Sequence, residues 1–155
     1  MTEVERKFRV AQVPEGVADG VPLRQAYVAI DGAVEVRIRD AGGDCSLTVK
    51  GGHGLERAEV EMTIDAAAFA ALWPLAGDRH LEKRRARVPL GDVVAELDRY
   101  EGRLAGLAVV EVEFPDRAAA DAFDPPTWFG DELTGQRGWS NAALARDGAP
   151  PDARG

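Results

Sequence analysis

The feature that most constrains this chain is a strict alternation of apolar and polar residues that recurs in short segments. Residues 57–64 alternate without a break, with apolar side chains at even positions and charged or polar ones at odd positions. Segments 34–39 and 110–114 follow the same rule. Because side chains with a period of two point to opposite faces of a β-strand, each segment is expected to be a strand with one apolar and one polar face.

Turn residues divide the chain into about eight such strands. Asp31-Gly32, Gly42-Gly43 and Gly91-Asp92 are typical of tight turns between antiparallel strands. The expected strands are 2–10, 22–30, 34–40, 46–50, 57–64, 79–89, 93–100 and 107–114. Short helices are expected at 66–72, 116–123 and from Ser140 to Arg146, each preceded by a capping Asp or Ser. The expected fold class is mainly β, of the α+β type.

Length and composition fit one soluble domain. The 155 residues are 45% apolar and 30% charged, which predicts a single domain over 1–147 and a flexible tail over 148–155. No apolar run reaches 18 residues and no signal segment is found, so we expect a cytoplasmic protein without a membrane partner. The single cysteine, Cys45, fits a reducing compartment. A net charge of −8 argues against nucleic acid as a partner. The sequence leaves open whether the protein forms a homodimer.

The polar faces of these strands carry balanced acids and bases in blocks of one sign. The acids are Glu3, Glu5, Glu59, Glu61, Glu96, Asp98, Glu111 and Glu113. The bases are Lys7, Arg37, Arg39, Lys50, Arg57, Lys83, Arg85 and Arg87. Like charges on one strand face repel each other, so each block suggests a counter-ion.

Two arrangements of the charged face are open. About eight strands can close into a barrel, and a small soluble barrel usually has an apolar interior and a solvated, charged exterior. However, the amphipathic helices must bury their apolar stripes, and the apolar outside of a sheet is their natural partner. The charged face would then be the interior.

A charged interior with both signs predicts a particular ligand. Arginine and lysine bind phosphate oxygens, whereas clustered carboxylates need a divalent cation such as Mg²⁺, Mn²⁺ or Ca²⁺. A chain of phosphates with a bound metal ion would provide anionic oxygens for the basic side chains and a cation for the acidic ones. The alternative is a barrel whose charged surface binds a partner protein.

Ordered motifs along the chain resemble the CYTH superfamily, the triphosphate tunnel metalloenzymes. The N-terminal Glu3-Val4-Glu5-Arg6-Lys7 looks like the family's E-x-E-x-K signature. The resemblance continues through 36–39, 47–51, 57–61, 81–85, 96–98, 110–113, 132–135 and Ser140-Asn141. Trp139 stands where short bacterial members often have tyrosine.

The resemblance implies an eight-stranded antiparallel closed β-barrel tunnel with a charged interior and a few outer helices. It implies that Mg²⁺ or Mn²⁺ is the cofactor and that Glu5, Lys7, Glu111 and Glu113 are catalytic. Substrate phosphates would be bound by Lys7, Arg37, Arg39, Lys50, Arg57, Lys83 and Arg85. Metal would be held by Glu3, Glu5, Glu59, Glu61, Asp98, Glu111 and Glu113.

The expected substrate is inorganic triphosphate, hydrolysed to pyrophosphate and phosphate. Only Tyr27 and Tyr100 supply aromatic rings on the predicted inner faces, which gives little to recognise an organic group. Adenylate cyclase, nucleoside or thiamine triphosphatase, and a non-catalytic polyphosphate-binding module are the alternatives.

Overall fold

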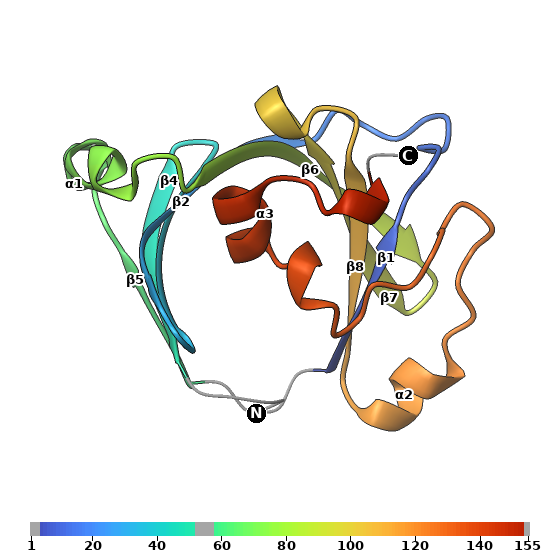
Figure 1. Cartoon of the computed structure of the whole chain (residues 1–155). Coiled ribbons are helices and arrows are strands. Elements are labelled where there is room, and N and C mark those ends of the chain that lie inside the picture. Colours follow the sequence, from blue (N-terminus) through green and yellow to red (C-terminus); the bar gives the residue numbers. More distant parts are fainter. Residues whose placement is uncertain (1–3, 52–57, 154–155) are drawn as a thin grey trace.

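Eight antiparallel strands form one sheet in the computed structural model, which describes residues 4–51 and 58–153 (Figure 1). The strands are β1 (Val4–Arg9), β2 (Val21–Asp31), β3 (Val34–Ala41), β4 (Asp44–Gly51), β5 (Ala58–Thr63), β6 (His80–Leu90), β7 (Val93–Tyr100) and β8 (Ala108–Phe114). The α-helices are α1 (Ala66–Leu72), α2 (Arg117–Ala122) and α3 (Asn141–Asp147). Short 3₁₀ turns are η1 (Trp73–Ala76), η2 (Gly102–Leu104), η3 (Arg137–Trp139) and η4 (Pro151–Ala153).

The sheet is curved but open. Its strand order is β1-β8-β7-β6-β2-β3-β4-β5, and over the described residues the edge strands β1 and β5 are not paired with each other. The expected closure into a barrel is therefore wrong, although the mainly β class and the eight antiparallel strands are confirmed. Both edge strands carry acidic residues, Glu5 on β1 and Glu59 and Glu61 on β5.

Helices α1 and α2 cover the convex side of the sheet, which is the second of the two arrangements that the sequence pattern left open. Phe69 of α1 packs with Ile38 and Ala26 of the sheet, and Arg24 lies over the rings of Phe69 and Trp73. Ala120 of α2 belongs to the core that includes Val110, Val112 and Phe114. Because these helices bury the apolar strand residues, the charged alternate residues face the concave side.

Helix α3 lies within the concavity of the sheet, which the sequence did not predict (Figure 1). Its Leu144, together with Trp139, packs against Tyr27 and Tyr100 on the inner face of the sheet. Ser140 caps the helix, because its hydroxyl accepts a hydrogen bond from Ala143 N at 3.1 Å. The C-terminal segment therefore fills one end of the concave face and leaves the charged remainder as the candidate site.

Residues 148–153 contact the body of the protein. Ala149 and Ala153 pack on the core around Trp139, and Arg9 donates a hydrogen bond to the Ala153 carbonyl at 3.3 Å. The single-domain boundary at 147 stays a prediction. Within residues 4–51 and 58–153, no helix has the length and apolar character required to cross a membrane.

Gly20, just before β2, is expected to tolerate no side chain. Its φ is +86°, and a Cβ there would collide with the Arg85 carbonyl oxygen on β6. Gly16 has a similar φ of +82° but open space around it. Gly20→Ala should therefore lower the free energy of unfolding by about 1–3 kcal/mol more than Gly16→Ala does. Denaturant unfolding of both variants measures this difference, and equal losses would show that the collision is relieved at no cost.

Candidate functional site

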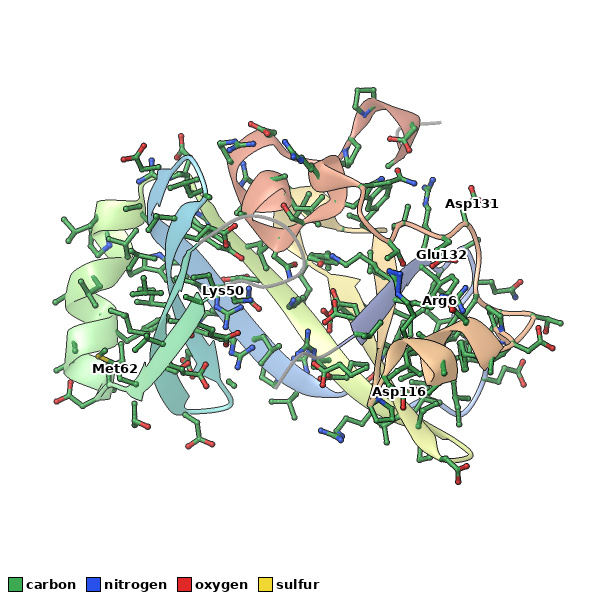
Figure 2. The ribbon with its side chains drawn as sticks, turned by 90° about the horizontal axis from the view of Figure 1, so that it is seen from below. Arg6, Lys50, Met62, Asp116, Asp131 and Glu132 are labelled. Carbon is green, nitrogen blue, oxygen red and sulfur yellow. The ribbon has the colours of Figure 1, made fainter. Side chains whose placement is uncertain are left out.

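The concave face brings together charged residues from seven strands. Neighbouring strands pair Lys7 with Glu111, Arg85 with Asp98, and Lys50 with Glu59. Figure 2 shows Lys50 of β4 on the inner side of the sheet and Met62 of β5 on the side of α1. The structure therefore brings Lys7, Glu111, Arg85, Asp98 and Lys50 to one face of the sheet.

Arginines on β3 form the cationic part of this face. Arg37 donates to the Thr48 hydroxyl at 3.4 Å and lies 3.9 Å from Glu61. The buried Nε atoms of Arg37 and Arg39 have no hydrogen-bond partner among the described residues. Burial, with help from the positive charges of Arg37 and Arg85, lowers the pKa of Arg39. Cations gathered in this way, with N–H groups unused, are typical of a site for an anion.

Carboxylates of β1 and β8 form the acidic part. Burial and the adjacent Glu111 raise the pKa of Glu5 to about 8. Burial also disfavours the charged form of Glu111, but Lys7, whose Nζ lies 3.2 Å from Glu111 Oε1, and a hydrogen bond from Glu5 outweigh it and lower the pKa of Glu111. A proton on Glu5 therefore relieves the repulsion in this pair. A divalent cation bound by the same oxygens can take the place of that proton.

Lys83, Asp98 and Arg85 form a buried ionic cluster between these two parts. Both oxygens of Asp98 accept hydrogen bonds from Arg85, at 2.7 and 2.8 Å, and Lys83 Nζ lies 2.9 Å from Asp98 Oδ2. Arg85 also contacts Glu96 at 3.1 Å. With both oxygens engaged by cations, Asp98 is placed to balance the charge of Lys83 and Arg85.

The remaining predicted residues lie at the edge of the site. Glu59 and Glu61 are on the exposed edge strand β5, where Glu61 accepts a hydrogen bond from Thr48 at 2.9 Å. Glu113 is exposed on β8 and pairs across the sheet with Glu5. Glu3 and Arg57 lie outside the described residues. In residues 4–51 and 58–153, no group of three or more His, Cys, Asp or Glu side chains is gathered closely enough to hold a metal ion.

Sequence reasoning missed several neutral residues of the site. Gln25 and Thr48 are fully buried on the same strand faces as the predicted Tyr27 and Lys50, so their position in the alternation was an available signal. Asn141 was noted only as part of a motif. Its Oδ1 accepts hydrogen bonds from Tyr100 at 2.7 Å and Lys83 at 3.3 Å. Nothing in the local sequence predicts this contact, because it joins α3 to the concave face.

The ion pair between Arg6 and Glu132 holds the C-terminal segment beside β1. Arg6 binds both oxygens of Glu132, at 2.7 and 3.0 Å, and Figure 2 shows the two side chains together. The Thr134 hydroxyl accepts a hydrogen bond from Lys7 N at 3.0 Å, and Lys7 Nζ donates to the Trp139 carbonyl at 3.1 Å. These contacts fix Lys7 of the site to the segment that leads into α3.

Guanidinium groups and paired carboxylates on the concave face of one curved antiparallel sheet are groups suited to a polyanion and to cations, respectively. A model of the CYTH domain matches residues 1–130. The chain therefore belongs to the CYTH family.

Named relatives are similar over nearly their full lengths. An inorganic triphosphatase of Nitrosomonas europaea is 45% identical over 94% of this chain and 97% of its own. A crystal structure of an inorganic triphosphatase superimposes with a TM-score of 0.75 at 42% identity, over 94% of this chain and 95% of that chain. A structure of a putative adenylate cyclase from Bacillus halodurans is 18% identical, covers 78% of this chain and 86% of its own, and has a TM-score of 0.57. It shares the fold alone.

Proposed function

We propose that this protein hydrolyses inorganic triphosphate to pyrophosphate and phosphate on the concave face of its sheet. The observation that carries the proposal is the pair of half-buried arginines, Arg37 and Arg39, whose buried Nε atoms have no hydrogen-bond partner among the described residues. The near-full-length similarity to an inorganic triphosphatase supports the same reaction.

Phosphate oxygens are bound by the cations of the face. In this proposal the binding residues are Lys7, Arg37, Arg39, Lys50, Arg57, Lys83 and Arg85. Guanidinium groups suit this role because each can donate two parallel hydrogen bonds to one phosphoryl group. Lys83 and Arg85 also keep Asp98 ionised, so their positions are fixed before the substrate arrives.

Carboxylate oxygens form the set that would hold a divalent cation. The proposed residues are Glu5, Glu111 and Glu113, with Glu3, Glu59 and Glu61 as further members. The raised pKa of Glu5, which follows from burial and from the adjacent Glu111, supports this choice, because a cation would replace the proton that Glu5 holds near neutral pH. A bound Mg²⁺ or Mn²⁺ would supply neutralisation of phosphate charge and a water of lowered pKa.

The reaction itself is a displacement at the terminal phosphorus. A water oxygen attacks in line, the bond from phosphorus to the bridging oxygen breaks, and pyrophosphate leaves. The developing charge on the leaving oxygens is stabilised by the fixed guanidinium groups. Lys7, held by Glu111 and the Trp139 carbonyl, keeps the terminal phosphate oriented for this attack.

Phosphate release from inorganic triphosphate, ATP and thiamine triphosphate, compared in parallel, tests the proposal. Each reaction is run with Mg²⁺, Mn²⁺ or EDTA, and cyclic AMP is measured in the ATP reaction. We expect metal-dependent release that is fastest from inorganic triphosphate. Cyclic AMP as the product would assign the cyclase reaction instead, and binding without turnover would leave a polyphosphate-binding module. Magnesium or manganese as the ion and the cytoplasm as the location stay predictions.

Metal binding at neutral pH is expected to release a proton. Because the pKa of Glu5 is about 8 in the metal-free protein, Glu5 is protonated at pH 7, and an incoming cation must displace that proton. Calorimetric titration with Mn²⁺ in buffers of different ionisation enthalpy should show release approaching one proton per ion at pH 7 and little release above about pH 9. Glu5→Gln removes this proton and is the matched control. Equal heats in all buffers for the unmodified protein would contradict the shared proton.

The same carboxyl gives the metal-free protein a pH-dependent stability. The folded state holds a proton on Glu5 at pH values where the unfolded chain has lost it, above about 4.5. The stabilisation is complete below that pH and is lost as the pH rises through about 8. A melting temperature measured in EDTA should therefore decline over this window.

A further inference from the structure

Gln25 is a buried residue of the concave face to which neither the charge pattern nor the proposed mechanism gives a role. It lies on β2 and is 1% exposed. Across the sheet it pairs with Arg39 on β3 and with Leu81 on β6. It is therefore placed beside one of the two arginines that carry the proposed function.

The side-chain amide of Gln25 has an unused donor. Its Nε2 atom is buried and has no hydrogen-bond partner among the described residues. Burial raises the pKa of the Tyr27 hydroxyl to about 12, and the side-chain amide of Gln25 acts weakly in the opposite direction as a donor to that hydroxyl. The contact falls short of hydrogen-bond geometry, so Gln25 Nε2 keeps no full acceptor among the described residues. A buried donor without an acceptor costs folding free energy, so its retention calls for a partner that is absent from the protein itself.

Thr48 shows that the unused donor is not a general property of buried residues on this face. Thr48 is also 1% exposed, but its hydroxyl accepts a hydrogen bond from Arg37 and donates one to Glu61. Buried donors without a partner among the described residues also include the Nε atoms of Arg37, Arg39 and Arg99 and the Nε1 atom of Trp139. Of these residues, Arg39 pairs directly with Gln25 across the sheet. A neutral N–H and a cationic N–H side by side, both lacking acceptors, match the oxygens of an anion.

We propose that Gln25 is a substrate-binding residue whose amide donates a hydrogen bond to a phosphoryl oxygen of inorganic triphosphate, next to Arg39. This inference rests on the proposed function of the same site. In this role Gln25 would increase the affinity for inorganic triphosphate without adding a positive charge to the site. Removing its N–H donor should then weaken triphosphate binding but leave the stability of the ligand-free protein unchanged or higher.

Gln25→Met removes the donor and keeps the length of the side chain. In EDTA without ligand, the melting temperature should stay the same or rise by about 2–4 °C, because an unmet buried donor has been removed. The dissociation constant for inorganic triphosphate, measured by calorimetry, should increase about tenfold, since a hydrogen bond to a charged oxygen is lost. KM should rise by a similar factor with little change in kcat, because the contact is made in both ground and transition states.

Two control variants separate binding from structure. Thr48→Val removes a hydroxyl whose hydrogen bonds are satisfied, so it should lower the melting temperature. Arg24→Gln changes the adjacent residue on the convex side, where Arg24 pairs with Asp40, and should leave KM unchanged. Gln25→Leu repeats the test with a second apolar side chain in case methionine packs poorly.

The outcomes separate the two proposals. Weaker binding with an unchanged or higher melting temperature in either Gln25 variant supports the inference. Unchanged binding in both variants, or a lowered melting temperature in both, overturns it and assigns Gln25 a structural role, while the proposed function stands if the unmodified protein hydrolyses inorganic triphosphate. An unmodified protein that neither binds nor hydrolyses inorganic triphosphate overturns the proposed function, and this inference with it.

Discussion

Asp98→Asn is expected to destabilise the protein by about 3–5 kcal/mol, or roughly 6–20 °C in melting temperature. Asp98 is the buried counter-ion of Lys83 and Arg85, and the side chain of Lys83 is fully buried. Asparagine would keep the shape of the side chain but leave two cations without that negative charge. Thermal and urea unfolding, measured in EDTA so that metal binding does not contribute, give the size of the loss.

Asp40→Asn is the matched control, because Asp40 pairs with the more exposed Arg24 on the convex side. An exposed ion pair contributes about 0–1 kcal/mol, so this variant should lose far less stability than Asp98→Asn. Similar losses in the two variants would contradict the role of Asp98 as a buried counter-ion.

The pH dependence of this loss follows from the pKa of Asp98. Burial alone would raise that pKa, but Lys83 and Arg85 outweigh burial and hold it below its usual value. The stabilising charge is therefore fully present above the unfolded pKa of about 3.9 and is lost as the pH falls through the lower folded value. The difference between the unmodified protein and Asp98→Asn should therefore shrink below about pH 4.

Glu111→Gln is expected to reduce the turnover of inorganic triphosphate by at least about 100-fold. Glu111 stands between Lys7 and Glu5, so glutamine would remove both the partner of Lys7 and one proposed oxygen ligand of the metal. The fold should persist, because the change also removes the repulsion between Glu111 and Glu5. Steady-state phosphate release with saturating Mn²⁺ and circular dichroism measure the two effects separately.

Glu101→Gln serves as the comparison, since Glu101 is exposed and pairs with Arg84 away from the concave face. It should retain the activity of the unmodified protein. Glu111→Gln with more than half of that activity would remove Glu111 from the catalytic set.

The alternation of apolar and polar residues predicted the strands and the two faces of the sheet. The polar face of residues 57–64 and the apolar face of 110–114 identified strands, and capped helices at 66–72 and 116–123 indicated which face is covered. Helices α1 and α2 do pack on the convex side, which confirms that the charged face is concave. Alternation is a local property of the sequence. Strands can therefore be recognised from it without knowing the strand order in the sheet.

The same alternation does not predict whether the sheet closes into a barrel. Alternation fixes the face on which Glu5 or Glu61 lies, but it does not determine whether β1 and β5 hydrogen-bond to each other. That outcome depends on contacts between two edges that are far apart in the sequence, which the local spacing of residues does not record.

The sequence by itself determined the strands, the two faces of the sheet and the charged residues that share one face, because each follows from side-chain type and spacing along the chain. Only the tertiary structure decided the open edges, the placement of α3 within the concavity, and the distinct roles of residues with equal charge. Asp98 is ion-paired with Lys83 and Arg85, whereas burial and the neighbouring Glu111 raise the pKa of Glu5 to about 8. The difference arises from burial and from neighbours on other strands, and these are set when the chain folds.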